Sequence, residues 1–93
     1  MISPTKESVE EQLKQILLVV LKNEVDASQL QPDVALVDEG LSLDSVALLE
    51  FVVRIENEFN IIVDDGVLVR EHFESLSSLA SVIQKEIVRQ KKT

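Results

Sequence analysis

The residues of this chain best suited to chemistry are an acid and a hydroxyl, Asp44 and Ser45, at the start of an apolar segment that runs to Phe59. Both residue types are preferred at the N-cap of a helix, where a side-chain oxygen accepts a hydrogen bond from a backbone N–H. A helix N-terminus also favours a phosphate group, because free N–H groups and the positive end of the helix dipole lie there. The pair therefore indicates either a plain helix cap or a serine placed to bear a phosphate-linked group. Asp44 would then be its cap or a carboxylate that faces a metal ion.

No second chemical site stands out elsewhere in the sequence. The chain has one histidine, His72, and no cysteine, which excludes disulfides, thiolate catalysis and cysteine metal centres. A histidine without a second ligand or a triad partner is expected to be a surface or loop residue. The acids at 38–39 and 64–65 do not have the spacing of a calcium loop. We therefore predict no metal site and no catalytic residue, which disfavours a free-standing enzyme.

Length and composition indicate one small folded domain, residues 1–93. Apolar residues make up 45% of the chain and charged residues 28%, with only two glycines and two prolines, unlike a disordered tail. The N-terminal segment is polar and contains acid, whereas a secretion signal is basic and then apolar. The longest apolar run, Ile16–Leu21, is far shorter than the roughly 20 residues that cross a bilayer. We expect a cytoplasmic protein without a membrane span.

The charge of the chain is strongly acidic, with nine basic and seventeen acidic side chains and a net charge of −8. Nucleic acid is therefore not expected as a partner, because its phosphates would be repelled. Between Asp38 and Asp65 there are eight acids and one base, Arg54, so this stretch carries −7. Such a face often serves only solubility. Its concentration around Ser45 favours docking to basic protein surfaces.

Apolar residues at helical spacing predict an all-α fold. A first helix is expected from an N-cap at Ser3, with Pro4 at the first helical position, to about Asn23. Residues 24–43 lack a sustained period and are predicted to form a long ordered loop whose apolar side chains plug the bundle. One helical turn is expected within Asp33–Asp38.

The C-terminal third predicts a turn and two more helices. A turn at Asp64–Gly66 is followed by a short helix or irregular turn at Val67–Glu71. The last helix is expected to be opened by Ser75 or Ser77 and to fray from Gln90. Together these elements predict a small antiparallel four-helix bundle, with three longer helices, one short helix and the long loop between the first two.

The strongest helix prediction begins at Asp44 or Ser45 and ends near Phe59, with Asn60 as its breaker. Its apolar residues fall on two stripes. The predicted core stripe is Leu48, Phe51, Val52, Ile55 and Phe59. The second stripe is Val46, Leu49 and Val53.

The second stripe is either buried under the long loop or exposed as a contact surface. A chain of this size has no room for a helix that is buried on all sides, which favours exposure. Glu50 and Glu56 flank the stripe, and an apolar centre with a charged rim is typical of a transient docking site.

Several segments resemble the acyl carrier proteins and related carrier domains, and they cover nearly the whole chain. Asp44-Ser45-Val46 is followed by a long helix with Glu50 and the ending Ile55-Glu56-Asn57-Glu58-Phe59. The pattern of the first helix, the stretch Leu36-Val37-Asp38-Glu39-Gly40-Leu41 and the start Phe73-Glu74-Ser75-Leu76-Ser77-Ser78-Leu79 are also similar to the family.

The resemblance implies a four-helix fold in which Ser45, beside Asp44, carries 4'-phosphopantetheine through a phosphodiester. The thiol of that arm would hold acyl or aminoacyl groups as thioesters. The implied partners are a phosphopantetheinyl transferase, which would present coenzyme A and supply the activating base, and acyl-activating, acyl-transferring and condensing enzymes with basic docking surfaces. Docking is expected on Val46, Leu49, Glu50, Val53 and Glu56, and the carrier is expected to be a monomer.

Three departures from the family pattern favour a specialised fatty-acid, polyketide or aminoacyl carrier over the housekeeping fatty-acid one. Val46 replaces the usual leucine, and Ala47 stands where many fatty-acid carriers have an acid. The stretch Gly40–Ser45 is also one residue longer than in the commonest fatty-acid form. The alternative is an unmodified docking module or complex subunit with the same fold, in which Ser45 is only a cap.

Overall fold

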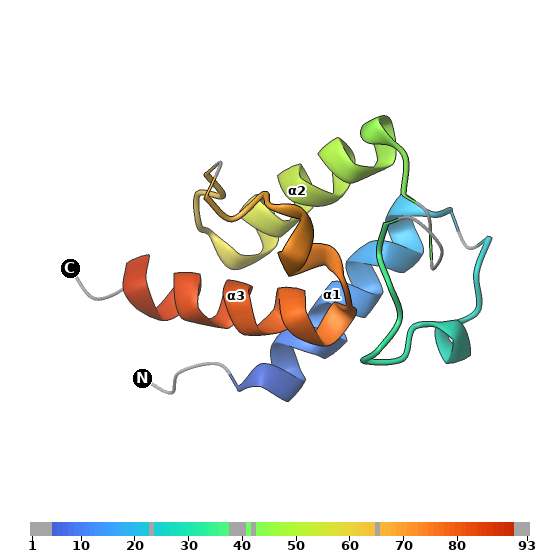
Figure 1. The fold of residues 1–93 in the computed structure, drawn as a ribbon, viewed down its shortest axis with the longest axis horizontal. Coiled ribbons are helices and arrows are strands. Elements are labelled where there is room, and N and C mark those ends of the chain that lie inside the picture. The colour runs from blue at the N-terminus through green and yellow to red at the C-terminus, as the bar shows by residue number, and fades with distance from the viewer. Residues whose placement is uncertain (1–4, 23, 38–40, 42, 65, 91–93) are drawn as a thin grey trace.

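The computed structural model describes residues 5–22, 24–37, 41, 43–64 and 66–90. Three α-helices and two short 3-10 segments follow one another along the chain (Figure 1). They are α1 (Lys6–Val20), η1 (Ala27–Gln29), α2 (Ser45–Phe59), η2 (Arg70–Phe73) and α3 (Leu76–Gln90). No strand occurs in these described ranges, so the predicted all-α class is confirmed.

The minor helical elements differ from those predicted. In place of a fourth helix, the described chain has the four-residue 3-10 segment η2, displaced from the predicted Val67–Glu71. The reason is the turn before it, in which Asp64 accepts hydrogen bonds from the N–H groups of Gly66 and Val67. The helical turn predicted within Asp33–Asp38 is absent from the described residues 33–37, and Asp38 lies outside the described part of the chain.

The helical turn between α1 and α2 is η1 instead. It is stabilised locally, because the Asp26 N–H donates to Gln29 Oε1 at 2.7 Å and the Gln29 N–H donates to the Asp26 carbonyl at 2.9 Å. A side-chain cap of this kind holds one turn without any apolar period.

Helix α1 begins and ends inside its predicted bounds. Its N-cap is Thr5, whose Oγ1 accepts from the Ser8 N–H at 3.1 Å, and not Ser3 as predicted. The helix ends at Val20 because Lys22 adopts a left-handed backbone with φ 54°, which cannot continue an α-helix. Ser3, Pro4 and Asn23 lie outside the described residues.

Helix α2 has the predicted bounds. Asp44 is extended (φ −80°, ψ 177°), and its Oδ1 accepts from the Ala47 N–H at 2.7 Å, which makes it the N-cap. At the other end Asn60 takes the left-handed conformation (φ 55°, ψ 50°) that asparagine tolerates better than most residues. Of the two candidate caps, the structure therefore selects Asp44 and leaves the Ser45 side chain out of the capping hydrogen bond.

Helix α3 is opened by Ser75, as predicted, since Ser75 Oγ accepts from the Ser78 N–H at 3.0 Å. The predicted fraying does not begin at Gln90, and residues 91–93 lie outside the described part of the chain. The Gln90 amide accepts from the Ile62 N–H and donates to the Ile62 carbonyl, both at 2.9 Å, and also donates to Glu86 at 3.1 Å. These bonds fasten the end of α3 to the segment that follows α2.

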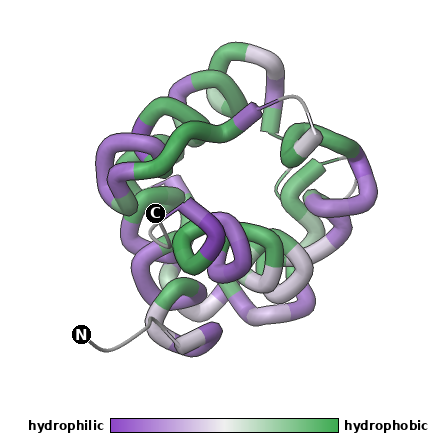
Figure 2. Tube along the Cα trace, turned by 90° about the vertical axis from the view of Figure 1, so that its left-hand side faces the viewer, coloured by the Kyte–Doolittle hydropathy of each residue, from purple (hydrophilic) through white to green (hydrophobic). Residues whose placement is uncertain are grey.

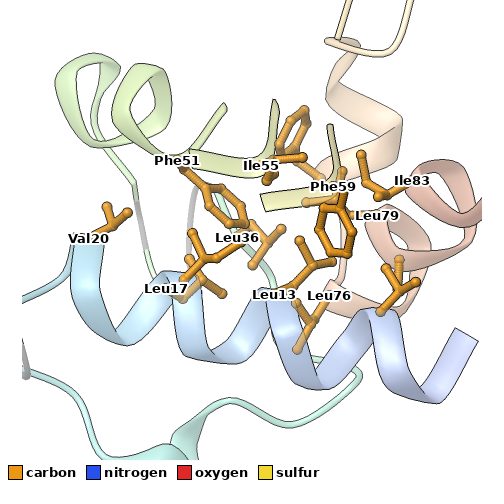
Figure 3. Packing of buried hydrophobic residues seen from close by; sticks show 14 of the residues in the cluster. Leu13, Leu17, Val20, Leu36, Phe51, Ile55, Phe59, Leu76, Leu79 and Ile83 are labelled. Atoms are coloured by element: carbon orange, nitrogen blue, oxygen red, sulfur yellow. The ribbon is translucent and has the colours of Figure 1, made fainter. Parts of the chain in front are cut away.

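The core lies where α1 packs against both α2 and α3, while η2 packs on α3. Figure 3 shows Phe51 and Phe59 pointing from α2 toward α1, with Leu36 among them. Along the helices, hydrophobic residues alternate with hydrophilic ones (Figure 2), as expected for helices with one buried face. Of the predicted core stripe of α2, Phe51, Val52, Ile55 and Phe59 are buried, and Leu48 is partly buried against the core.

The segment between α1 and α2 contributes to the core, as predicted. Leu30 and Leu36 are fully buried, and Val34, Val37 and Leu41 pack partly buried against the same cluster. Backbone hydrogen bonds hold this segment against the start of α3. The Leu36 N–H donates to the Phe73 carbonyl at 3.2 Å, and the Ser77 N–H donates to the Pro32 carbonyl at 2.8 Å.

We predict that Ile55→Ala and Phe59→Ala each lower the free energy of unfolding by about 2 to 5 kcal/mol, because each truncation leaves a cavity in the core. Val53→Ala is the matched control on the same helix, and its cost should stay within about 0.5 kcal/mol, as for most surface changes. Urea denaturation at constant m-value measures both. Equal losses at Val53 and Phe59 would contradict the assignment of the two faces.

We also predict that Asp44→Ala lowers the free energy of unfolding by about 0.5 to 2 kcal/mol, because the Ala47 N–H loses its acceptor. Asp44→Ser should recover most of that loss, since serine is also a good N-cap. Ser45→Ala should change thermal unfolding little. A cost at Ser45 equal to that at Asp44 would show that the capping role is assigned to the wrong residue.

Candidate functional site

Ser45 is the first residue of α2 and is exposed to solvent. Because the Asp44 carboxylate already caps the Ala47 N–H, the Ser45 hydroxyl is not needed for capping. The backbone N–H groups of a first helical turn have no acceptor four residues back, and together with the dipole they favour an anion at this position. A hydroxyl exposed here is well placed to bear a phosphodiester.

A pocket opens beside Ser45. Its volume of about 420 Å³ lies within the size range of small-molecule sites. Leu48, Leu49 and Val52 line it from α2. The opposite wall consists of Val37, Leu68, Arg70 and Phe73. The lining residues are therefore apolar apart from Ser45 and Arg70.

The second stripe of α2 is exposed, as predicted. Val46 is 75% exposed, Leu49 67% and Val53 50%. Burial under the preceding segment is excluded, because the large apolar residues of that segment, such as Leu30 and Leu36, are buried in the core. Leu49 belongs to this stripe and also lines the pocket, so the exposed strip Val46, Leu49 and Val53 continues into the hollow beside Ser45.

The two acids that flank the strip have different surroundings. Glu50 is half-exposed, and its Oε2 accepts from Arg54 Nε one turn further along α2 at 3.0 Å. Glu56 accepts a hydrogen bond from the Val63 N–H at 2.8 Å and is partly buried. Glu50 can exchange its surface ion pair for a partner's cation at little cost. Glu56 also fixes the backbone after α2.

His72 and Glu86 are titratable residues outside the pocket that make hydrogen bonds within the fold. His72 Nδ1 lies 2.7 Å from the Val67 carbonyl oxygen and so holds the turn that leads into η2. The hydrogen bond from Arg89 keeps the pKa of Glu86 below its ordinary value, and Gln90 contributes in the same direction. Among the described residues, no group of three histidine, aspartate or glutamate side chains could hold a metal ion.

The opposite wall of the pocket is the part that sequence reasoning did not find. Val37, Leu68 and Arg70 come from segments without a helical period, and only the packing of η2 and the preceding loop brings them beside α2. Phe73 did carry a signal, because it begins the stretch Phe73–Leu79 that resembles the carrier family. Arg70 carried none, since the residues beside it at the pocket lie far from it in the sequence, on α2 and in the segment before α2.

No helix in the described ranges combines the length and apolarity needed to span a membrane.

Searches of the curated proteins and of the solved structures gave no match. A family model described as a phosphopantetheine attachment site matches residues 11–83, most of the chain. Domains of this family carry covalent 4'-phosphopantetheine, are generally non-catalytic and work with partner enzymes. The match spans α2 whole, together with both walls of the pocket, and the exposed serine at the helix start fits the phosphate end of that group. The chain therefore belongs to the phosphopantetheine-binding carrier family.

Proposed function

We propose that this protein is an acyl carrier protein in which Ser45 is the attachment residue for 4'-phosphopantetheine. The observation that carries the proposal is the exposed Ser45 hydroxyl at the start of α2, left out of the cap by Asp44 and open to a pocket. A serine that served only as a cap would hold the hydrogen bond that Asp44 holds. This observation argues against the alternative of an unmodified docking module.

The proposed attachment reaction requires no general base on the carrier itself. Ser45 Oγ would form the phosphodiester, and its proton would pass to a base of the transferase that presents coenzyme A. The Asp44 carboxylate accepts the Ala47 N–H and holds the first turn of α2 in place. The role proposed for Asp44 is thus to position Ser45.

The pocket supports a role in sheltering what the arm carries. An acyl or aminoacyl group held as a thioester could fold back against Leu48, Val52 and Phe73, where burial of each methylene would contribute about 0.8 kcal/mol. An apolar pocket of this size suits a specialised fatty-acid, polyketide or aminoacyl cargo. We propose one such carrier domain over residues 1–93, acting as a cytoplasmic monomer.

The exposed strip supports a docking role for Val46, Leu49 and Val53. Three large apolar side chains in a row on one helix face give a partner the apolar centre of an interface. Glu50 lies at the edge of the strip, where it can meet a basic residue of a transferase or of an acyl-handling enzyme. Glu56 is proposed as a second rim contact, although its carboxylate also serves the Val63 N–H.

We predict that Ser45→Ala abolishes modification by a broad-specificity phosphopantetheinyl transferase with coenzyme A, because the proposed acceptor hydroxyl is lost. Intact mass before and after incubation measures the attached arm. Ser78→Ala, which removes a hydroxyl on α3, is the control and should be modified as wild type. A mass increase that persists in Ser45→Ala would overturn the assignment.

We predict that Leu49→Ala slows modification of Ser45 while the melting temperature stays within a few degrees of wild type, because an exposed side chain contributes little to stability. Ile62→Ala is the matched control, since Ile62 is 73% exposed but lies beyond the C-terminal end of α2. The initial rate of transfer is the measurement. A Leu49→Ala protein as unstable as Phe59→Ala, yet modified at the normal rate, would show that the recognition surface lies elsewhere.

The charged rim is tested with the same rate. Glu50→Lys should slow transfer without loss of stability, and transfer to the wild type should slow as salt rises, since exposed charges are screened beyond about 8 Å at physiological ionic strength. Glu56→Lys is a poorer probe, because it also removes the acceptor of the Val63 N–H. Indifference of the rate to both salt and Glu50→Lys would leave the acidic face only a solubility role.

A further inference from the structure

The pocket beside Ser45 contains one charged side chain among the described residues, and it is a cation. Arg70, the first residue of η2, shares the pocket lining with Ser45, while the remaining lining residues are apolar. The Arg70 side chain is exposed to solvent and its guanidinium carries a permanent positive charge. It also presents a planar set of donors that matches phosphate oxygens.

A phosphodiester on Ser45 would add negative charge to the most acidic part of the chain. The one base between Asp38 and Asp65 is Arg54. It lies on another side of α2, where it lines a separate pocket with Gln15 and Glu58. It is therefore not placed to compensate a charge that enters the hollow beside Ser45.

We propose that Arg70 binds the phosphodiester of the prosthetic arm, an inference that rests on Ser45 as the attachment residue. The guanidinium donates charge-assisted hydrogen bonds to the phosphate oxygens, which are stronger than neutral ones. This contact joins the wall formed by η2 to the start of α2 and directs the first part of the arm along the pocket. Arg70 is thus a binding residue for the modified form of the protein.

The contact links the modification to the stability of the domain. η2 packs on α3, and the Phe73 carbonyl at its end accepts from the Leu36 N–H. A bond from Arg70 to a group on α2 would close the pocket from both sides. The holo form should therefore melt a few degrees above the apo form at low salt.

The test uses wild-type protein and the variant Arg70→Gln, with Arg54→Gln as the control, each as apo protein and loaded to completion as judged by intact mass. We expect the ³¹P resonance of wild-type holo protein to move as salt rises to about 1 M, where the Debye length falls to about 3 Å. In Arg70→Gln that movement and the holo–apo difference in melting temperature should both be lost. In Arg54→Gln both should remain.

A second measurement compares the wild-type protein before and after the arm is attached, so no variant has to be modified. In wild-type protein the Arg70 Nε–H resonance, assigned from the apo variants, should shift when the arm is attached, and the Arg54 Nε–H should not. An unmoved Arg70 resonance overturns the proposal. A shifted Arg70 resonance with a ³¹P signal that Arg70→Gln leaves unchanged also overturns it, because the contact is then to the amide groups of the arm. Absence of any mass increase in the wild type refutes the carrier function itself, and this proposal with it.

Discussion

The geometry of the site depends on the backbone of Leu36. Its N–H donates to the Phe73 carbonyl at 3.2 Å, its carbonyl accepts from the Leu43 N–H at 3.1 Å, and its side chain is fully buried. Leu43 directly precedes the cap Asp44, and Phe73 ends the wall that faces α2. One residue from an irregular segment therefore joins the two walls of the pocket. Each of these two backbone hydrogen bonds contributes only about 1 kcal/mol net to stability. The fully buried Leu36 side chain also holds the backbone in the position that both bonds require.

Helix α2 meets separate demands on its separate faces. The face with Phe51 and Ile55 is buried against α1, and the strip Val46, Leu49 and Val53 stays in water at a cost in exposed apolar area. At the N-terminus of α2, the Asp44 carboxylate accepts the hydrogen bond of the Ala47 N–H, so the hydroxyl of the neighbouring Ser45 is not used for capping. A fold that capped α2 with Ser45 would have tied the hydroxyl to its own backbone.

The sequence predicted most of what local chemistry decides. The bounds of α2 followed from a cap at Asp44 or Ser45 and a breaker at Asn60, and its two stripes followed from helical spacing. What it did not predict depends on individual hydrogen bonds that leave no apolar period. The η1 turn is held by local bonds between Asp26 and Gln29, whereas Gln90 bonds to Ile62 and Glu56 bonds to Val63 from further along the chain. Arg70 was missed because its neighbours at the pocket come from α2 and from the loop before it.

The exposed strip would make many small domains pair with themselves, since an apolar row on one helix is complementary to its own copy. Here a second copy would bring its own acidic α2 toward Glu50, and each chain carries a net charge of −8. Repulsion between like charges opposes that encounter, while a basic enzyme surface meets attraction at the same face. On the proposed docking role, the acidity of the domain would therefore oppose contact of the strip with other carriers and favour contact with the proteins that load and unload them.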